Sequence, residues 1–279
     1  MSFLNFEEKT LPLDEWVQTS VDWLVLNYRD FFQTIKAPIE WCLQGFEWFF
    51  NVLPPVVVII LFAAASWRFA GRRVAVFTIV TFLLAGYLGL WGETMITLAM
   101  VISAVFFCAL AGIPLGVMAG RSDRFEIILR PMLDAMQTTP AFVYLVPVVM
   151  LFSIGTVSGI LATIIFALPP IVRLTSLGIR QVHPELVEAA LSFGATPWQV
   201  LSRVQFPLAL PSIMAGLNQT LMMALSMVVI AALIGAGGLG NPVVQGLNTL
   251  EIGLATIGGL TIVLLAMVLD RITQGFAKL

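Results

Sequence analysis

Apolar residues occur along the chain in seven long stretches, and few charged residues lie within these stretches. A helix that crosses a bilayer needs roughly 20 predominantly apolar residues, and the seven stretches approach or exceed that length. The pattern therefore predicts an all-α integral membrane protein. We expect membrane-spanning helices over residues 52–69, 74–91, 94–119, 131–153, 157–177, 210–236 and 252–270.

The composition agrees with this pattern. Of the 279 residues, 59% are hydrophobic and only 11% are charged, whereas a soluble domain usually carries about 25% charged residues. The two cysteines, Cys42 and Cys108, lie far apart, and His183 is the single histidine. These counts exclude a disulfide framework and an ordinary zinc site, so we expect no metal. The acidic N-terminus lacks the basic segment and apolar core of a cleavable signal peptide.

The basic residues predict the orientation of the spans. If the N-terminus lies outside, the loops after the second, fourth and sixth spans also lie outside, and these loops contain no Lys or Arg. The excess of basic residues in the remaining loops then follows the positive-inside rule, which places the C-terminus in the cytoplasm. The cytoplasmic basic residues are Arg68, Arg72, Arg73, Arg121, Arg124, Arg130, Arg173, Arg180, Arg203, Arg271 and Lys278.

Residues 1–51 have a different character. From Val17 to Ile35, apolar side chains recur every three or four residues, which predicts one face of a helix. The spacing resumes at Ile39 after an interruption at Pro38, and the tryptophans of this segment suit a membrane interface. We expect an acidic N-terminal segment of one or two amphipathic helices on the outer face of the membrane. A packed soluble mini-domain is the alternative interpretation.

One polar stretch, residues 178–209, contrasts with the apolar sequence around it. Its HPEL sequence favours a helix start, and Gly194 can end that helix in the left-handed conformation. Thr196 then caps a second helix, whose Gln199 can reach back to complete a capping box. We expect this second helix to end before Pro207. The stretch therefore predicts a helix–glycine–helix hairpin in the longest cytoplasmic loop.

The hairpin also carries a specific spacing of residues. Glu188-Ala189-Ala190 is followed by three residues, Gly194, nine residues, and then Val204-Gln205-Phe206-Pro207. This arrangement resembles the EAA loop of ABC importer membrane subunits, with Val and Phe where the family pattern has Ile and Leu. The resemblance implies that the hairpin couples the chain to a separate ATPase subunit; a plain helical connector is the alternative. The implied coupling residues are Glu188, Ala189, Ala190, Gly194 and Pro207.

Two further stretches narrow the resemblance. MQTTPAFVYLVP (136–147) and GLNQTLMMALSMVVIAALIGAGGLG (216–240) are similar to permease subunits that carry glycine betaine, proline betaine, choline and related quaternary amines. This similarity implies a type I ABC importer transmembrane domain over residues 52–279, in a bacterial inner membrane. It also implies two copies of an ATPase and a separate substrate-binding protein. Because one chain supplies one coupling hairpin, we expect a symmetric homodimer with the translocation path along its two-fold axis.

Neutral polar residues within the predicted spans are the candidates for that path. Polar groups in lipid need partners, so they face other helices or a water-filled path, and nearby prolines are typical of hinges. The alternative is hydrogen bonding between packed helices. Phe142, Tyr144 and Trp91 are weaker candidates for contact with a quaternary ammonium group. The path candidates are Gln137, Thr138, Pro140, Asn218, Gln219 and Ser226.

The remaining features bear on the energy source. The sequence contains no GxxxxGK[ST] phosphate-binding loop, so we expect no cofactor in this chain and ATP-Mg in the partner ATPase. We also expect no enzymatic activity and no nucleic-acid partner, whereas membrane lipid is an expected partner. The alternatives are an ion-coupled secondary transporter and an osmotically gated channel for compatible solutes. Asp134 and Asp270 lie near cytoplasmic ends of spans, which disfavours proton coupling, and neither alternative accounts for the EAA spacing.

Overall fold

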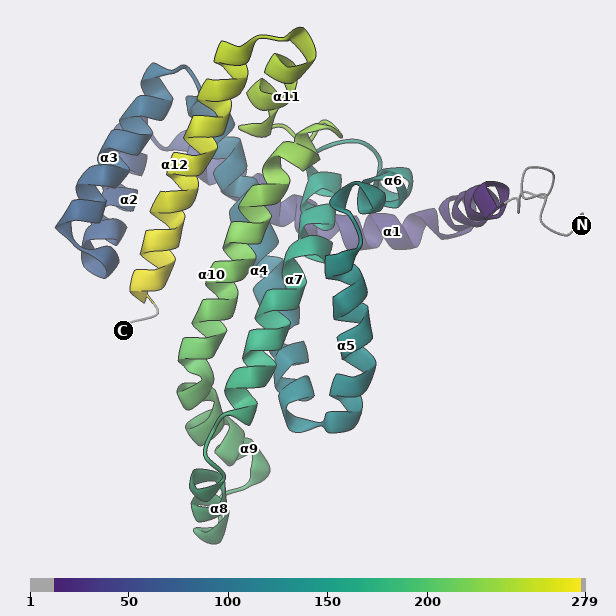
Figure 1. Ribbon diagram of the computed structural model, residues 1–279, viewed down its shortest axis with the longest axis vertical. Helices are drawn as coiled ribbons and strands as arrows, with labels where there is room; N and C mark the ends of the chain where they lie inside the picture. The colour runs from purple at the N-terminus through teal and green to yellow at the C-terminus, as the bar shows by residue number, and fades with distance from the viewer. Residues whose placement is uncertain (1–12, 277–279) are drawn as a thin grey trace, which may run out of the picture.

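The computed structural model describes residues 13–276, which form a set of helices (Figure 1). Expectations that involve residues 1–12 and 277–279, including Lys278, lie outside the described residues. Helices α4, α7 and α10 lie side by side at the centre of the molecule, and α7 packs against the other two. The helices are α1 (Leu13–Val52), α2 (Pro55–Ala70), α3 (Arg72–Tyr87), α4 (Trp91–Arg121), α5 (Asp123–Thr138), α6 (Ala141–Phe152), α7 (Thr156–Arg180), α8 (Pro184–Ser192), α9 (Pro197–Val200), the π-helical turn η1 (Leu201–Gln205), α10 (Phe206–Ala232), α11 (Gly240–Thr249) and α12 (Ile252–Phe276).

The number of helices that can cross a membrane is lower than the sequence pattern predicts. Within residues 13–276, four helical stretches are long and apolar enough: α4, α7, α12 and the continuous stretch Pro197–Ala232. The number rises to six if each of two bent helix pairs is one span. Seven spans were expected because α2 and α3 were each counted as one. Both have only 16 residues, fewer than the roughly 20 of a full span.

The predicted span over residues 131–153 is divided into α5 and α6, whose axes are bent by 99°. Pro140 stands at the break. The residue before it, Thr139, has a ψ of 128°, because a proline disfavours the helical conformation in the residue that precedes it. The break predicted at Pro140 is therefore confirmed, and the bend is sharp enough to divide the stretch into two helices.

Small residues allow the three central helices to approach closely. Gly112, Gly116 and Gly120 follow one another every four residues along α4 and face α7. A Cβ atom at Gly116 would lie 2.5 Å from Cβ of Thr175, and one at Gly120 would lie 2.8 Å from Cβ of Ile179. Glycines also lie where α7 meets α10. Helices α4, α7 and α10 therefore form a tightly packed unit of the kind that small residues permit in membranes.

α1 runs crosswise to the central helices (Figure 1). Its second half packs on the core through Ile39, Leu43 and Phe50, whereas most side chains of its first half are exposed. The helix departs from helical dihedral angles at Tyr28 and continues through Pro38. The interruption expected at Pro38 is therefore wrong, since burial of the apolar side chains that follow offsets the lost hydrogen bond. The position of α1 on the outer face of the membrane stays a prediction.

Candidate functional site

The polar stretch folds as a helical hairpin that protrudes from one end of the molecule (Figure 1). After α8, Gly194 takes the left-handed conformation, with φ of +83°. The backbone N–H groups of Phe193 and Ala195 donate hydrogen bonds of 3.1 Å to the carbonyls of Ala189 and Ala190, respectively. The two alanines of the EAA spacing therefore hold the turn closed, and the predicted glycine stop is confirmed.

The second helix of the hairpin begins with the predicted capping box. The N–H of Gln199 donates to Oγ1 of Thr196 at 3.3 Å, and the N–H of Thr196 donates to Oε1 of Gln199 at 2.8 Å. The helix does not end before Pro207, however. α9 continues through η1 into α10. The wider π-helical turn before Pro207 lets the helix continue although proline has no backbone N–H to donate. The hairpin is therefore continuous with a membrane-spanning helix, and the expected end at Pro207 is wrong.

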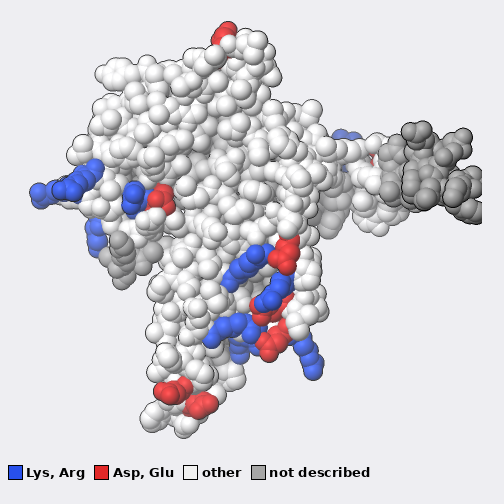
Figure 2. All heavy atoms as spheres, viewed as in Figure 1, with Lys and Arg blue, Asp and Glu red and all other residues white. Residues whose placement is uncertain are grey.

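The hairpin, from its tip to α9, presents large apolar side chains to solvent. Phe193 is 92% exposed and Trp198 is 71% exposed. Figure 2 shows acidic atoms at this tip, which belong to α8. Exposed apolar surface with charged neighbours is typical of a contact site for another protein. Of the predicted coupling residues, Glu188, Ala189 and Gly194 are exposed, Ala190 is half-buried, and Pro207 is exposed at the start of α10.

The first group of predicted path residues lies at the bend between α5 and α6. Gln137 is half-buried, whereas Thr138 and Pro140 are exposed. Across the bend, the hydroxyl of Tyr144 donates to the carbonyl of Thr139 at 2.9 Å. Tyr144 therefore stabilises the bend, which is a role that the sequence pattern did not indicate.

The second group of predicted path residues lies on α10, and its side chains lie on two different faces of that helix. Asn218 faces α12, where its Nδ2 donates to Oδ1 of Asp270 at 2.9 Å. Gln219 and Ser226 are exposed, and they share one face of α10 with Met222 because the three lie three and four residues apart. Asn218 therefore contributes a contact between helices, while the other two polar side chains lie on a free face.

One chain does not bring the two groups of path residues together. α7 lies between α5 and α10 and packs against both (Figure 1). A cavity lined by both groups would therefore need surfaces from more than one copy of the chain.

A charged network between α5 and α7 was not predicted from the sequence. Arg173 contacts Asp134 at 2.6 Å. Arg180 contacts Asp123 at 2.6 Å and Glu126 at 2.7 Å, and Figure 2 shows opposite charges gathered on this part of the molecule. The two arginines lie seven residues apart and so share one face of α7, which is the signal that could have revealed the network.

Comparison with known proteins identifies the family. The family model described as "Binding-protein-dependent transport system inner membrane component" matches residues 112–279. The chain belongs to this family. This permease is 53% identical to the glycine betaine/proline betaine transport system permease protein ProW of Escherichia coli, over 98% of this chain and 77% of that protein.

Two further relatives match this permease over nearly the whole length of both chains. The glycine betaine/carnitine transport permease protein GbuB of Listeria monocytogenes is 44% identical, over 96% of both chains. The glycine betaine transport system permease protein OpuAB of Bacillus subtilis is 43% identical, over 95% of this permease and 94% of that protein.

The fold agrees with the family. A solved structure of the inward-facing MetNI methionine ABC transporter matches with a TM-score of 0.55 and 26% identity, over 66% of the permease and 90% of that chain. The permease is thus an all-α, multi-pass membrane subunit with the fold of a type I ABC importer, as the sequence predicts. Its family membership implies a separate ATPase, which is the enzyme of the system, and a substrate-binding protein.

Proposed function

We propose that the chain is the membrane-spanning subunit of an ATP-driven importer for glycine betaine, proline betaine and related quaternary amines, including choline. The observation that carries this proposal is the exposed, doubly capped EAA hairpin in a chain 53% identical to a glycine betaine/proline betaine permease. The names of the other relatives support the same class of substrate.

The hairpin is the contact with the ATPase. Docking buries the exposed side chains of Phe193 and Trp198, and removal of apolar surface from water favours association. Because the hairpin continues through η1 into α10, a movement of the ATPase reaches the membrane without a flexible joint. ATP-Mg binds to the ATPase, and this chain holds no cofactor.

The working unit is a symmetric homodimer with two ATPase copies. Two identical chains supply the two hairpins that two ATPases require. The translocation path follows the two-fold axis, where free faces of both copies meet. Thr138 and Pro140 at the α5–α6 bend and Gln219 and Ser226 on α10 are exposed in one chain, which suits residues that line such a path.

The hairpin lies in the cytoplasm and the N-terminus outside the cell. Residues 1–51 form an interfacial segment on the outer face, and residues 52–279 form the transmembrane domain. Figure 2 supports this orientation, because several basic side chains gather on the half of the molecule that carries the hairpin. Basic residues are favoured on the cytoplasmic side of a membrane protein.

An ion-coupled transporter or a gated channel is less well supported. A proton-coupled transporter needs a titrating acid in its path. Asp134 pairs with Arg173 at 2.6 Å, and Asp270 accepts hydrogen bonds from Asn218 and Gln274 at 2.9 and 2.7 Å. Both acids therefore have partners within the helix bundle.

The proposal is tested by transport in proteoliposomes that contain this permease, its ATPase and its binding protein. Uptake of radiolabelled glycine betaine should require hydrolysable ATP and should be inhibited by unlabelled proline betaine or choline. A non-hydrolysable ATP analogue serves as the control. Uptake driven by an ion gradient in the absence of ATP would contradict the proposal.

A further inference from the structure

The guanidinium group of Arg180 joins three helices at the base of the hairpin. It contacts Asp123 at 2.6 Å and Glu126 at 2.7 Å, both in α5. It also donates to the carbonyl of Ala119, in the last turn of α4, at 2.7 Å. Arg180 is the last residue of α7, and the hairpin begins at Pro184. One side chain thus connects the start of the hairpin to the ends of two other helices.

These contacts matter because α5 has little other attachment. Leu133 is the one buried residue of this helix, and Leu129 and Met136 are half-buried against the core, so few apolar side chains hold it. A second ion pair, between Arg173 and Asp134 at 2.6 Å, fixes the same helix farther along α7. Beside these pairs lies a cavity of about 360 Å³, which leaves space between the two helices. The position of α5 against α7 therefore depends largely on charged side chains.

The rest of the bundle is connected in a different way. α7 contacts α4 and α10 through closely packed glycines such as Gly116 and Gly178, and such packing moves as a unit. α5 is the exception, and it ends at the bend where Thr138 and Pro140 lie.

We infer that Arg180 is the positioning residue that transmits movement of the hairpin to α5 and to the α5–α6 bend. The inference rests on the proposed function, because it names the residues through which the ATPase acts on the translocation path. A guanidinium suits this role, since its planar fork can hold several acceptors at once, whereas a lysine ammonium presents one point charge. An isolated exposed ion pair would contribute little.

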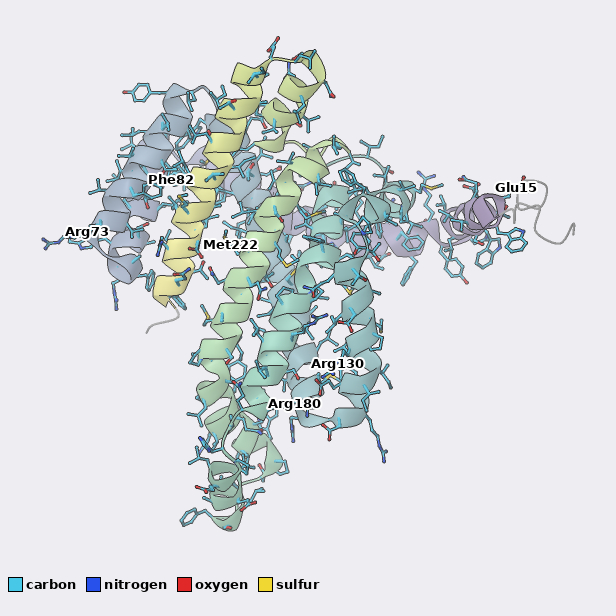
Figure 3. All side chains as sticks on the ribbon, in the orientation of Figure 1. Glu15, Arg73, Phe82, Arg130, Arg180 and Met222 are labelled. Atoms are coloured by element: carbon cyan, nitrogen blue, oxygen red, sulfur yellow. The ribbon has the colours of Figure 1, made fainter. Side chains whose placement is uncertain are left out.

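Arg130 provides a matched control. It lies beside the same cavity and contacts Glu126 at 2.8 Å, but both residues belong to α5. Figure 3 labels both arginines. Substitution of Arg130 removes a similar charge and a bond to the same carboxylate without detaching α5 from α7.

The test uses the full complex with ATPase and binding protein in proteoliposomes, with wild-type permease, Arg180→Gln, Arg180→Lys and Arg130→Gln. Arg180→Gln should keep the ATPase bound and keep its basal hydrolysis. Uptake of glycine betaine per ATP hydrolysed should fall by about tenfold, a typical size for a coupling between two sites. Arg180→Lys should show a smaller fall, and Arg130→Gln none. Removing the acceptors together, by Asp123→Asn with Glu126→Gln, should reproduce the effect of Arg180→Gln.

An unchanged ratio of uptake to hydrolysis in Arg180→Gln, beside a working wild-type complex, would overturn the inference and leave the proposed function intact. Loss of the bound ATPase in both Arg180→Gln and Arg180→Lys would also overturn it, because Arg180 would then serve assembly. Absence of ATP-driven uptake in the wild-type complex would contradict the proposed function and, with it, this inference.

Discussion

The hydroxyl of Thr97 on α4 accepts a hydrogen bond of 2.8 Å from the backbone N–H of Leu239, which lies 142 residues later in the chain. Both residues are fully buried. The contact holds the glycine-rich segment after α10, where a Cβ atom at Gly238 would lie 2.6 Å from the Thr97 hydroxyl. α4 thereby fixes the connection between α10 and α11.

Replacing Thr97 with valine should destabilise the permease. The substitution keeps the shape of the side chain but leaves the N–H of Leu239 buried without an acceptor, which costs about 1–3 kcal/mol. Thr94→Val is the control, because the Thr94 hydroxyl bonds only to the carbonyl of Leu90 in its own helix. The melting temperature of the purified permease should fall more for Thr97→Val than for Thr94→Val. Equal melting temperatures would show that the contact with Leu239 is not needed.

The close packing of α4 on α7 gives a second prediction. Gly116→Ala places a methyl group 2.5 Å from Cβ of Thr175, so the helices must separate. Overpacking of this kind costs about 1–3 kcal/mol. At Gly92, on the same helix, a Cβ atom has no neighbour within 4 Å, so Gly92→Ala should be neutral or slightly stabilising. Thermal unfolding of the two variants measures the difference, and similar melting temperatures would contradict the packing described above.

Labelling with a membrane-impermeant thiol reagent tests the orientation. In a background without Cys42 and Cys108, Asn248→Cys should react in intact cells, because the proposed orientation places this exposed residue on the outer side. Thr196→Cys, exposed in the hairpin, should react only after the cells are opened. Labelling of position 196 in intact cells would reverse the orientation.

Substitutions of two neighbouring residues on α10 distinguish a role in the translocation path from a role in helix packing. Gln219 is exposed, so Gln219→Trp should block uptake by the reconstituted complex and leave the melting temperature unchanged. Asn218→Leu removes the bond to Asp270 and should lower the free energy of unfolding by about 1 kcal/mol. Normal uptake by the complex with Gln219→Trp permease would show that Gln219 does not line the translocation path.

Local features of the hairpin could be predicted from the sequence because they depend on nearby residues. The stop at Gly194 and the capping box of Thr196 and Gln199 need only the chain around them. The continuation of the helix past Pro207 was missed, because an inserted π-helical turn leaves no clear composition signal. The apolar spans were recognised from hydropathy, whereas the lengths of α2 and α3 depend on where the chain turns.

Long-range contacts were much less predictable. The pairing of Arg180 with Asp123 joins residues 57 positions apart. Charges in loops fit the topology pattern equally well whether or not they are paired. The direction in which Asn218 points was equally hidden, because a polar side chain in an apolar helix is compatible with a path or with a neighbouring helix.

In the proposed function, the EAA hairpin couples this permease to its ATPase. Its most direct test is ATP-driven uptake of glycine betaine by the reconstituted complex with Gly194→Val permease, measured with the amount of ATPase that co-purifies. Gly194 has a φ of +83°, which valine adopts only with strain, so the tip should be deformed while the spans stay folded. Gly253→Val is the control, because nothing lies within 4 Å of a Cβ atom there.

Gly194→Val should lose most of the co-purifying ATPase and most of the uptake, with a melting temperature close to that of the wild type. Gly253→Val should behave as the wild type. A Gly194→Val permease that retains its ATPase and transports glycine betaine at the wild-type rate would show that the hairpin does not couple the two subunits.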